Sequence, residues 1–325
     1  MENILRRAAL LAGLAGLLIA PMVAAQPATP SPALVRLVVP FPPGGSNDVI
    51  ARAAAPLLGK RLGSSVIVDN RAGAAGIIGS DTVARAPADA STLLLTSSTF
   101  LTTAATQSTV PYDPVSAFTP VAMIAQGPML LAVPALAPFK TPADLIAGAR
   151  RHPGVLNYGS AGVGSIGHMS TELLSSITKI RMVHIPYKGA ALALIDLASG
   201  QIGVMVSNYS SLVSQIKGGK VRALAVTSER ASPAFPDLPP LSQVAPGYAV
   251  EIWVSVFAPA GTPPQRIERL NREINEIART PELRIFLDPE GAAPVSMSPG
   301  ALAARIKEDL ALWKRIATER GIKTD

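Results

Sequence analysis

The sequence contains no cysteine, and this absence excludes several kinds of chemistry at once. Disulfide bonds, thiolate metal sites, iron–sulfur clusters and cysteine nucleophiles all need a residue that the chain lacks. Aromatic residues make up only 4% of the chain, which argues against binding of sugars or single-stranded nucleic acid by ring stacking.

Histidine and paired acidic residues are also scarce. The three histidines, His152, His168 and His184, stand in different local settings without the spacing of a metal site. No close pair of carboxylates suggests glycosidase chemistry. We therefore expect neither a metal nor a cofactor.

The formal net charge is +7, and the distribution of the basic residues shows whether this charge indicates a nucleic-acid partner. Residues 137–250 hold ten basic and five acidic residues, spread over strands, turns and helices. A nucleic-acid-binding protein would concentrate its basic residues in a patch or stripe. We therefore expect no nucleic-acid partner.

The first 25 residues have the order of regions typical of a secretory signal peptide. Arg6 and Arg7 precede the uncharged apolar run Ala8–Ala20, and small residues lead to a cleavage site near Ala25. The run is short for a membrane span of about 20 residues. The sequence predicts export and cleavage, and it leaves open whether the general secretory or the twin-arginine route is used.

Hydrophobic residues make up 48% of the full sequence, and the chain after the predicted signal peptide alternates short apolar runs with helical stretches. This alternation predicts an α/β protein with parallel strands and crossover helices, and the length suggests about two domains. The expected strands are Val35–Val39, Val66–Asp69, Leu93–Thr96, Val155–Tyr158, Arg181–Ile185, Ile202–Val206, Arg222–Val226 and Glu251–Ala258. The expected helices are Ser46–Arg61, Gly76–Ala86, one that begins at Thr141 and Pro142, Ser165–Ile177, Ala190–Ser199, Pro264–Arg279 and Pro299–Arg320.

A glycine-rich turn, Pro40–Asp48, follows the first strand and opens a helix. Gly44 and Gly45 let the backbone turn tightly, and the helix start adds partial positive charge, so an anion fits there without a basic side chain. Alternatively, this is a plain strand–helix turn in which Ser46 or Asp48 acts only as a cap. The sequence physics does not decide between the two.

A second glycine-rich turn, Tyr158–His168, contains the pattern G-x-G-x-x-G at Gly162, Gly164 and Gly167. The acidic residue that a dinucleotide site needs about 20 residues later is missing. What remains is another helix start with free N–H groups and the hydroxyls of Ser160 and Ser165. Ser165 and His168 are one helical turn apart, which leaves an exported serine hydrolase as an alternative function.

The motifs resemble, in order, those of the Bug-type substrate-binding proteins of tripartite tricarboxylate transporters. The matching blocks are Val38–Asp48 with Arg52, Val68–Gly76, Tyr158–Ser165 with His168, Ile185–Gly189, Leu224–Thr227 and Ala258–Pro263. The chain departs from the family pattern at Asp89–Thr92, Pro239–Gln243 and Ser255, which affects the expected turn geometry and hinge packing more than the fold.

The resemblance implies a non-enzymatic, periplasmic protein of the Venus-flytrap kind, type II-like, with each lobe a mixed, mostly parallel sheet flanked by helices. Residues 32–127 and 253–325 would form lobe 1, and residues 128–252 would form lobe 2. The protein, a monomer, would capture a dicarboxylate, tricarboxylate, acidic amino acid or aromatic carboxylate between the lobes and deliver it to the membrane permease subunits. A ligand-sensing partner of an envelope signalling system would share this fold.

The two turns and the serines that follow two other strands make up the expected ligand site. Its residues are Phe41, Gly44, Gly45, Ser46, Asp48, Ser97, Ser98, Ser160, Gly164, Ser165, His168 and Ser207. Ser97, Ser98 and Ser207 are included because ligands of α/β proteins bind at the carboxyl ends of strands.

Overall fold

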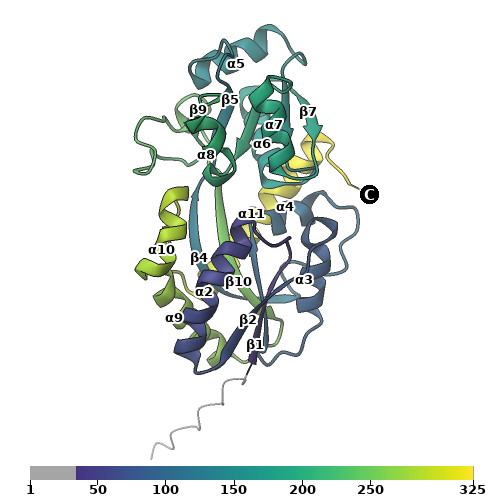
Figure 1. Ribbon diagram of the computed structural model, residues 1–325. Coiled ribbons are helices and arrows are strands. Elements are labelled where there is room, and N and C mark those ends of the chain that lie inside the picture. The colour runs from purple at the N-terminus through teal and green to yellow at the C-terminus, as the bar shows by residue number, and fades with distance from the viewer. Residues whose placement is uncertain (1–33, 325) are drawn as a thin grey trace, which may run out of the picture. The chain divides into compact units, whose positions relative to one another are not determined.

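The computed structural model describes residues 34–324, in which helices cover two mixed sheets (Figure 1). The predicted signal peptide, residues 1–25, and its cleavage site near Ala25 lie outside the described residues. Of the helices in residues 34–324, none is both long and apolar enough to cross a membrane.

The first sheet has the strand order β11-β4-β10-β3-β1-β2. Its strands are β1 (Leu34–Val39), β2 (Ser65–Asn70), β3 (Thr92–Ser97), β4 (Phe118–Pro128), β10 (Glu251–Pro259) and β11 (Ala293–Pro294). Strand β1 pairs in parallel with β2 and β3, whereas β10 runs antiparallel to both β3 and β4.

The second sheet has the order β7-β6-β8-β5-β9. Its strands are β5 (Leu130–Pro134), β6 (Asn157–Ser160), β7 (Val183–Pro186), β8 (Val204–Ser207) and β9 (Val221–Val226). The two sheets repeat one arrangement, because β5 lies antiparallel between β8 and β9 as β10 lies antiparallel between β3 and β4. The predicted fold class, α/β with mixed, mostly parallel sheets flanked by helices, is confirmed. Strands β1, β2, β3 and β4 share one direction, as do β6, β7, β8 and β9, whereas β10, β11 and β5 run the opposite way.

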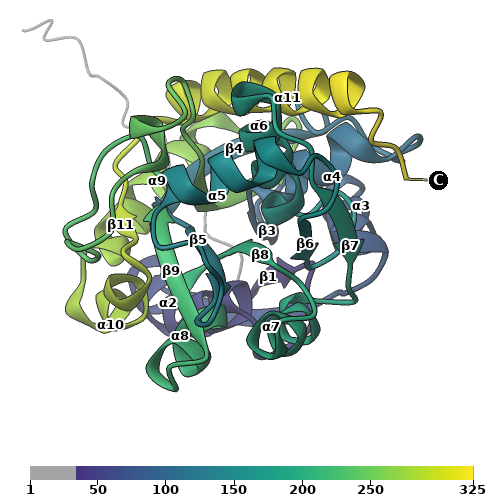
Figure 2. The ribbon, with the colours of Figure 1, turned by 90° about the horizontal axis from the view of Figure 1, so that it is seen from above.

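The helices enclose both sheets (Figures 1 and 2). They are α2 (Ser46–Leu62), η1 (Ala74–Gly76), α3 (Ile77–Ala84), α4 (Thr99–Thr106), α5 (Pro142–Arg151), α6 (Ile166–Thr178), α7 (Ala190–Ser199), α8 (Tyr209–Lys217), η2 (Leu241–Gln243), α9 (Pro264–Ala278), α10 (Pro281–Leu287), η3 (Asp288–Glu290) and α11 (Pro299–Arg320).

Local capping explains where several helices begin. The Thr141 hydroxyl accepts the N–H of Asp144 while the Asp144 carboxylate accepts the N–H of Thr141, and Pro142 occupies the first turn. This reciprocal capping box satisfies two donors that a helix start otherwise leaves unpaired. The helix start expected at Thr141 and Pro142 is therefore confirmed.

Two segments connect the sheets, a short one at Met129 and a longer one at residues 227–250 that contains η2. The first runs from β4 through Met129 to β5, and the second leads from β9 through Thr227 to β10 (Figure 1). The N–H of Met129 donates to Oγ1 of Thr227 over 2.8 Å, and the N–H of Thr227 donates to the carbonyl of Met129 over 2.9 Å. The two connections are thus bonded side by side.

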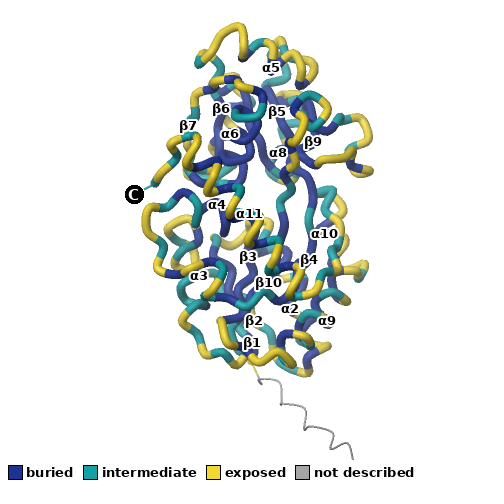
Figure 3. The backbone as a smooth tube through the Cα atoms, turned by 180° about the vertical axis from the view of Figure 1, so that it is seen from behind, coloured by how far each residue is buried: buried dark blue, intermediate teal, exposed yellow. Residues whose placement is uncertain are grey.

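Burial is concentrated in the inner strands of both sheets, which are largely dark blue in Figure 3, whereas the edge strands β2, β7 and β11 contain no buried residue. The residues expected to form lobes 1 and 2 are further joined by α11, which packs against α4 and α6 and crosses one side of the molecule in Figure 2. Near its end, Arg320 forms an ion pair with Glu172 of α6. The boundaries 32–127 with 253–325 and 128–252 stay a prediction, and we use the names lobe 1 and lobe 2 for these ranges.

Replacing Gly79 by alanine tests how closely α3 packs on the first glycine-rich turn. A Cβ atom at Gly79 would lie 2.7 Å from the carbonyl oxygen of Arg71 and 2.8 Å from Cα of Pro40. We expect Gly79→Ala to lower the free energy of unfolding by about 1–3 kcal/mol, because the backbone must shift. Gly300→Ala, on the open surface of α11, is the matched control and should leave stability unchanged or slightly higher. Denaturant unfolding measures both, and equal stability of the two variants would contradict the packing argument.

Candidate functional site

The first turn presents main-chain N–H groups at the start of α2. Gly44 has a φ of 86°, in the left-handed region that favours glycine, and Gly45 is the N-cap with extended backbone and no capping side chain. The N–H groups of Ser46, Asn47 and Asp48 have no hydrogen-bond partner within residues 34–324. Three donors and the positive end of a 17-residue helix therefore point out of this turn.

Asp48 holds the turn in place from beneath. One carboxylate oxygen accepts the N–H of Gly44 over 2.8 Å and Nε of Arg52 over 2.9 Å, and the other accepts Nδ2 of Asn70 over 2.9 Å. The same Asn70 amide donates to the carbonyl of Phe41. Burial opposes ionisation of Asp48, but the hydrogen bonds from Arg52, Gly44 and Asn70 outweigh it and lower its pKa below the ordinary value. Asp48 thus stays charged and shapes the turn.

The second turn forms the N-terminus of α6. Gly162 and Gly164 have φ values of 129° and 78°, and Ser165 is the N-cap, whose Oγ accepts the N–H of His168 over 3.4 Å. The N–H groups of Ile166 and Gly167 have no partner among the hydrogen bonds of the described chain. A Cβ at Gly167 would lie 2.4 Å from the carbonyl oxygen of Val206, so glycine allows α6 to lie directly against β8. This turn also presents free donors.

Three rings stack behind the second turn. The His168 and His184 rings lie 3.8 Å apart at 8°, and His184 lies 4.9 Å from the ring of Tyr158. Nδ1 of His168 accepts the N–H of Gly164, and Nε2 of His184 lies 2.7 Å from Oγ of Ser160. The histidine rings therefore support the turn from its buried side.

Burial keeps both histidines neutral. It lowers the pKa of His168 to about 3, with a smaller contribution from the charge of His184. It lowers the pKa of His184 to about 4, although the Glu172 carboxylate acts in the opposite direction. The Tyr158 hydroxyl donates to that same carboxylate.

The serines at the strand ends have different surroundings. Ser98 Oγ accepts the N–H of Trp253 over 2.9 Å, which ties the start of α4 to β10. Ser97 Oγ accepts Nδ2 of Asn47 over 3.3 Å, at the start of α2. Ser207 Oγ donates to Oδ1 of the neighbouring Asn208.

Two further hydrogen-bonded contacts join the lobes near the start of α8. Nδ2 of Asn208 donates to Oγ of Ser46 over 3.1 Å, so the end of β8 meets the start of α2. The carboxylate of Glu290 accepts the N–H of Ser210 in the first turn of α8, at 3.1 and 3.2 Å. Beside it, a Cβ at Gly291 would lie 2.8 Å from the ring of Phe235, so η3 packs closely against this loop of lobe 2.

A cavity of about 150 Å³ lies where these elements meet. Its lining residues come from both lobes and from the connecting segments: Thr99, Met129, Ala161, Ser165, Ile166, Gly167, Ala190, Met205, Val206, Ser207, Asn208 and Ile252. Of the site residues predicted from sequence, Ser165 and Ser207 line it directly. The other predicted residues are not among its lining residues, and the ligand-binding role of the whole set stays a prediction.

Few sequence features point to the remaining lining residues. Met129 lies in the segment between β4 and β5, Ile252 lies near the start of β10, and no motif marks either residue. Ile166 and Gly167 directly follow Ser165, and their place in the helix start was the one available signal. Met205 lies in a strand and Ala190 in a helix, and nothing in the sequence around either residue indicates that it lines a cavity.

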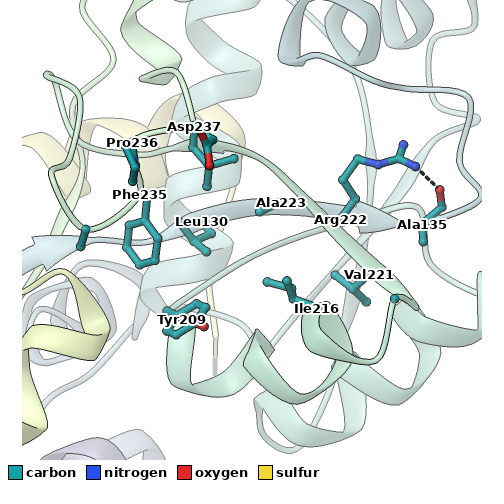
Figure 4. A pocket seen from close by; sticks show the side chains of 13 residues that line it. Leu130, Ala135, Tyr209, Ile216, Val221, Arg222, Ala223, Phe235, Pro236 and Asp237 are labelled. Carbon is teal, nitrogen blue, oxygen red and sulfur yellow. Dashed lines mark hydrogen bonds between the residues drawn. The ribbon is translucent and has the colours of Figure 1, made fainter.

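A larger cavity of about 530 Å³ opens elsewhere in lobe 2, between α8, β9 and the loop at Phe235 (Figure 4). Phe235, Leu130, Ile216 and Tyr209 give it an apolar wall, and Arg222 points away to donate to the carbonyl of Ala135. It contains none of the residues of the two glycine-rich turns. Among residues 34–324, no three His, Asp or Glu side chains gather in a way that would hold a metal ion.

The geometry of Ser165 bears on the hydrolase alternative. Its Oγ donates to the carbonyl of Gly162 over 2.8 Å, while Nδ1 of His168 is occupied by the N–H of Gly164. A serine nucleophile needs its hydroxyl hydrogen-bonded to a base. The hydrogen bonds of the described residues do not pair the Ser165 hydroxyl with the His168 ring, so they give the hydrolase interpretation no support.

Two sheets with one repeated strand order and a cavity between two lobes are the architecture of two-lobed solute-binding proteins. Comparison with known proteins gives the family. Residues 50–322 match the model of the tripartite tricarboxylate transporter family receptor, and the chain belongs to this family.

Several solved structures of similar proteins agree with this assignment. The structure of R. palustris Rpa4515 with adipate is 36% identical in sequence and has a TM-score of 0.79. The match covers 89% of this chain and 98% of the Rpa4515 chain. The periplasmic binding protein BugD is 30% identical, with coverage of 90% and 98% and a TM-score of 0.77. MatC from Rhodopseudomonas palustris with bound malate is 30% identical, with coverage of 87% and 98% and a TM-score of 0.76. The resemblance to Bug-type proteins inferred from the motifs is confirmed.

The buried histidine pair predicts a pH dependence of stability. In the unfolded chain a histidine has a pKa of about 6.5, so below that pH the unfolded state binds more protons than the folded state. The free energy of unfolding should therefore fall as the pH falls from 6.5 to 5, by up to about 1.4 kcal/mol per pH unit per histidine. Replacing His184 by phenylalanine keeps a stacked ring and should remove about half of this slope.

Denaturant unfolding at several pH values between 5 and 7 measures the effect. Gly300→Ala, which changes no titratable group, is the control and should keep the slope of the unchanged protein. An unchanged slope in His184→Phe would show that the pair does not titrate as argued.

Proposed function

We propose that this protein is a periplasmic receptor that captures a small carboxylate between its two lobes and delivers it to the permease of a tripartite tricarboxylate-type transporter. The observation that carries the proposal is the pair of helix starts, at α2 and α6, whose N–H groups are free. The start of α6 lines the interlobe cavity, and the start of α2 is hydrogen-bonded to the lining residue Asn208. Such groups hold an anion without a cationic side chain. Adipate and malate in the related structures are carboxylates.

The proposed mechanism is closure of the lobes about the segments at Met129 and Thr227. The carboxylate would accept main-chain N–H groups of both turns, with the serines and His168 of the predicted site shaping them. Closure would exclude water, and the ligand would favour the closed state by its contacts with both lobes. No bond of the ligand is broken, so we expect binding without turnover.

We further propose that residues 1–25 direct export and are cleaved near Ala25, and that the receptor acts as a monomer. The order of charged, apolar and small residues supports the cleavage. BugD, a periplasmic binding protein, supports the compartment. The permease subunits follow from the family and are not identified by any surface described above.

Calorimetric titration of the purified protein with succinate, adipate, citrate, glutamate and benzoate tests the proposal. We expect at least one acid to bind with one-to-one stoichiometry and to reduce the radius of gyration in small-angle scattering as the lobes close. If the acids leave both the heat signal and the scattering unchanged, the proposed function is wrong.

Glu290 allows a test of closure itself. Its carboxylate accepts an N–H at the start of α8 and also lies favourably at the positive end of that helix. We expect Glu290→Gln to weaken the affinity for the best-bound acid by roughly two- to fivefold, since the closed state loses this contact. Glu282→Gln, on the exposed face of neighbouring α10, is the control and should bind as the unchanged protein does. Equal affinity of the two variants would indicate that the Glu290 contact does not contribute to the bound state.

A further inference from the structure

We propose that the ligand is a carboxylate with a hydrocarbon body, aliphatic or aromatic, that carries no hydroxyl or amino group. The inference rests on the proposed function and concerns the same cavity. Family membership does not determine the chemistry of the ligand, because it specifies neither the length nor the polarity of the group that carries the carboxylate.

The surface available inside the cavity is apolar. Met129, Ile166, Met205 and Ile252 form the wall, and Val206 lies beside Met205. Met129 and Met205 are each only 1% exposed, so their side chains are packed in place. Methionine adapts its shape to irregular apolar partners, which suits a hydrocarbon group.

The polar side chains in the lining already have protein partners. Ser165 Oγ bonds to the main chain at Gly162 and His168, and Ser207 Oγ donates to Asn208. Asn208 in turn donates to Ser46 and Ser210 and accepts from Ser211. A hydroxyl on the ligand would have to compete with these bonds or stay unpaired, and an unpaired buried hydroxyl weakens binding.

No described residue in the lining carries a charge. The two nearby carboxylates are occupied, since Asp48 accepts from Gly44, Arg52 and Asn70 and Glu290 accepts from Ser210. A ligand ammonium group would therefore lose its hydration without gaining an anionic partner. This argument disfavours amino acids.

One carboxylate, by contrast, finds suitable donors. The N–H groups of Ile166 and Gly167 are free, and the Thr99 hydroxyl, on the lobe 1 side, has no partner among the hydrogen bonds of the described residues. Two N–H groups and a hydroxyl match the acceptor oxygens of one carboxylate. The cavity, at about 150 Å³, is smaller than the roughly 300–1,000 Å³ typical of sites for drug-sized ligands, so the hydrocarbon body is short.

Titration with matched acids tests the inference on the intact protein. Succinate, malate and aspartate differ by one hydroxyl or one amino group, and butanoate and 3-hydroxybutanoate form a second pair. We expect the unsubstituted acid of the better-bound series to bind about 10- to 100-fold more tightly than its substituted relatives. Equal or tighter binding of a hydroxylated or aminated acid overturns this inference while leaving carboxylate binding intact. Failure of all these acids and of the earlier panel overturns the proposed function.

Two variants place the effect in this cavity. Ala190 lines it at the first position of α7, where an aspartate suits the helix start, and Ala190→Asp should weaken binding of the unsubstituted acid by more than about tenfold through charge repulsion. Ala191→Asp, exposed on the next residue, is the matched control and should bind within about twofold of the unchanged protein. Similar losses in both variants would contradict the assignment of the cavity.

The second variant alters the apolar wall. Ile252 is half-buried on a strand, and Ile252→Thr keeps its branched shape while adding a hydroxyl. We expect the preference for the unsubstituted acid over the hydroxylated one to shrink by about threefold or more. An unchanged preference would show that this wall does not select the ligand.

Discussion

The paired main-chain and side-chain hydrogen bonds between Met129 and Thr227 are the constraint on which the rest of the structure depends. They join the only two places where the described chain passes from one sheet to the other. Strands β4 and β10 remain paired as far as Pro128 and Glu251. The two connections therefore start from neighbouring positions at the end of the first sheet. The interlobe cavity begins directly beside this point, with Met129 and Ile252 in its wall. In the proposed closure, the connecting segments therefore both carry the motion and contact the ligand.

The two glycine-rich turns show how a protein prepares for an anion without a cation in the site. Positive φ values at Gly44, Gly162 and Gly164 turn the chain so that free N–H groups point outward. Charged and ring groups lie behind the turns and hold them, through Asp48 and Arg52 in one case and His168 and His184 in the other. Because these groups satisfy one another, the surface left to a ligand consists of main-chain donors, the Thr99 hydroxyl and apolar side chains. The same internal pairing that shapes the turns thus underlies the proposed selectivity for a hydrocarbon body.

Much of the fold could be predicted from the sequence, because capping and periodicity are local. Helices α7 and α11 have the predicted ends, Ala190–Ser199 and Pro299–Arg320. Strand β4, however, contains Pro120 and Pro128, and α4 is rich in threonine, so local preferences argue against both elements. Burial between β10 and β11 stabilises β4 regardless of those preferences. The sequence did not predict that β10 and β5 run antiparallel to their neighbouring strands. The direction of a strand depends on the path of the chain between strands and not on the composition of the strand.

By itself, the sequence determined the α/β class, the positions of the two glycine-rich turns and the family to which they point, because each depends on residues close together in the chain. Only the tertiary structure decided which side chains surround the cavity. Ser46 and Asn208 are 162 residues apart and meet through a hydrogen bond, and Met129 and Ile252 come together because two connections are paired. No local pattern encodes such contacts, since burial of both sheets brings them together. That is why Asp48 and Ser165 could be named from their motifs, whereas the apolar wall became visible only in the folded protein.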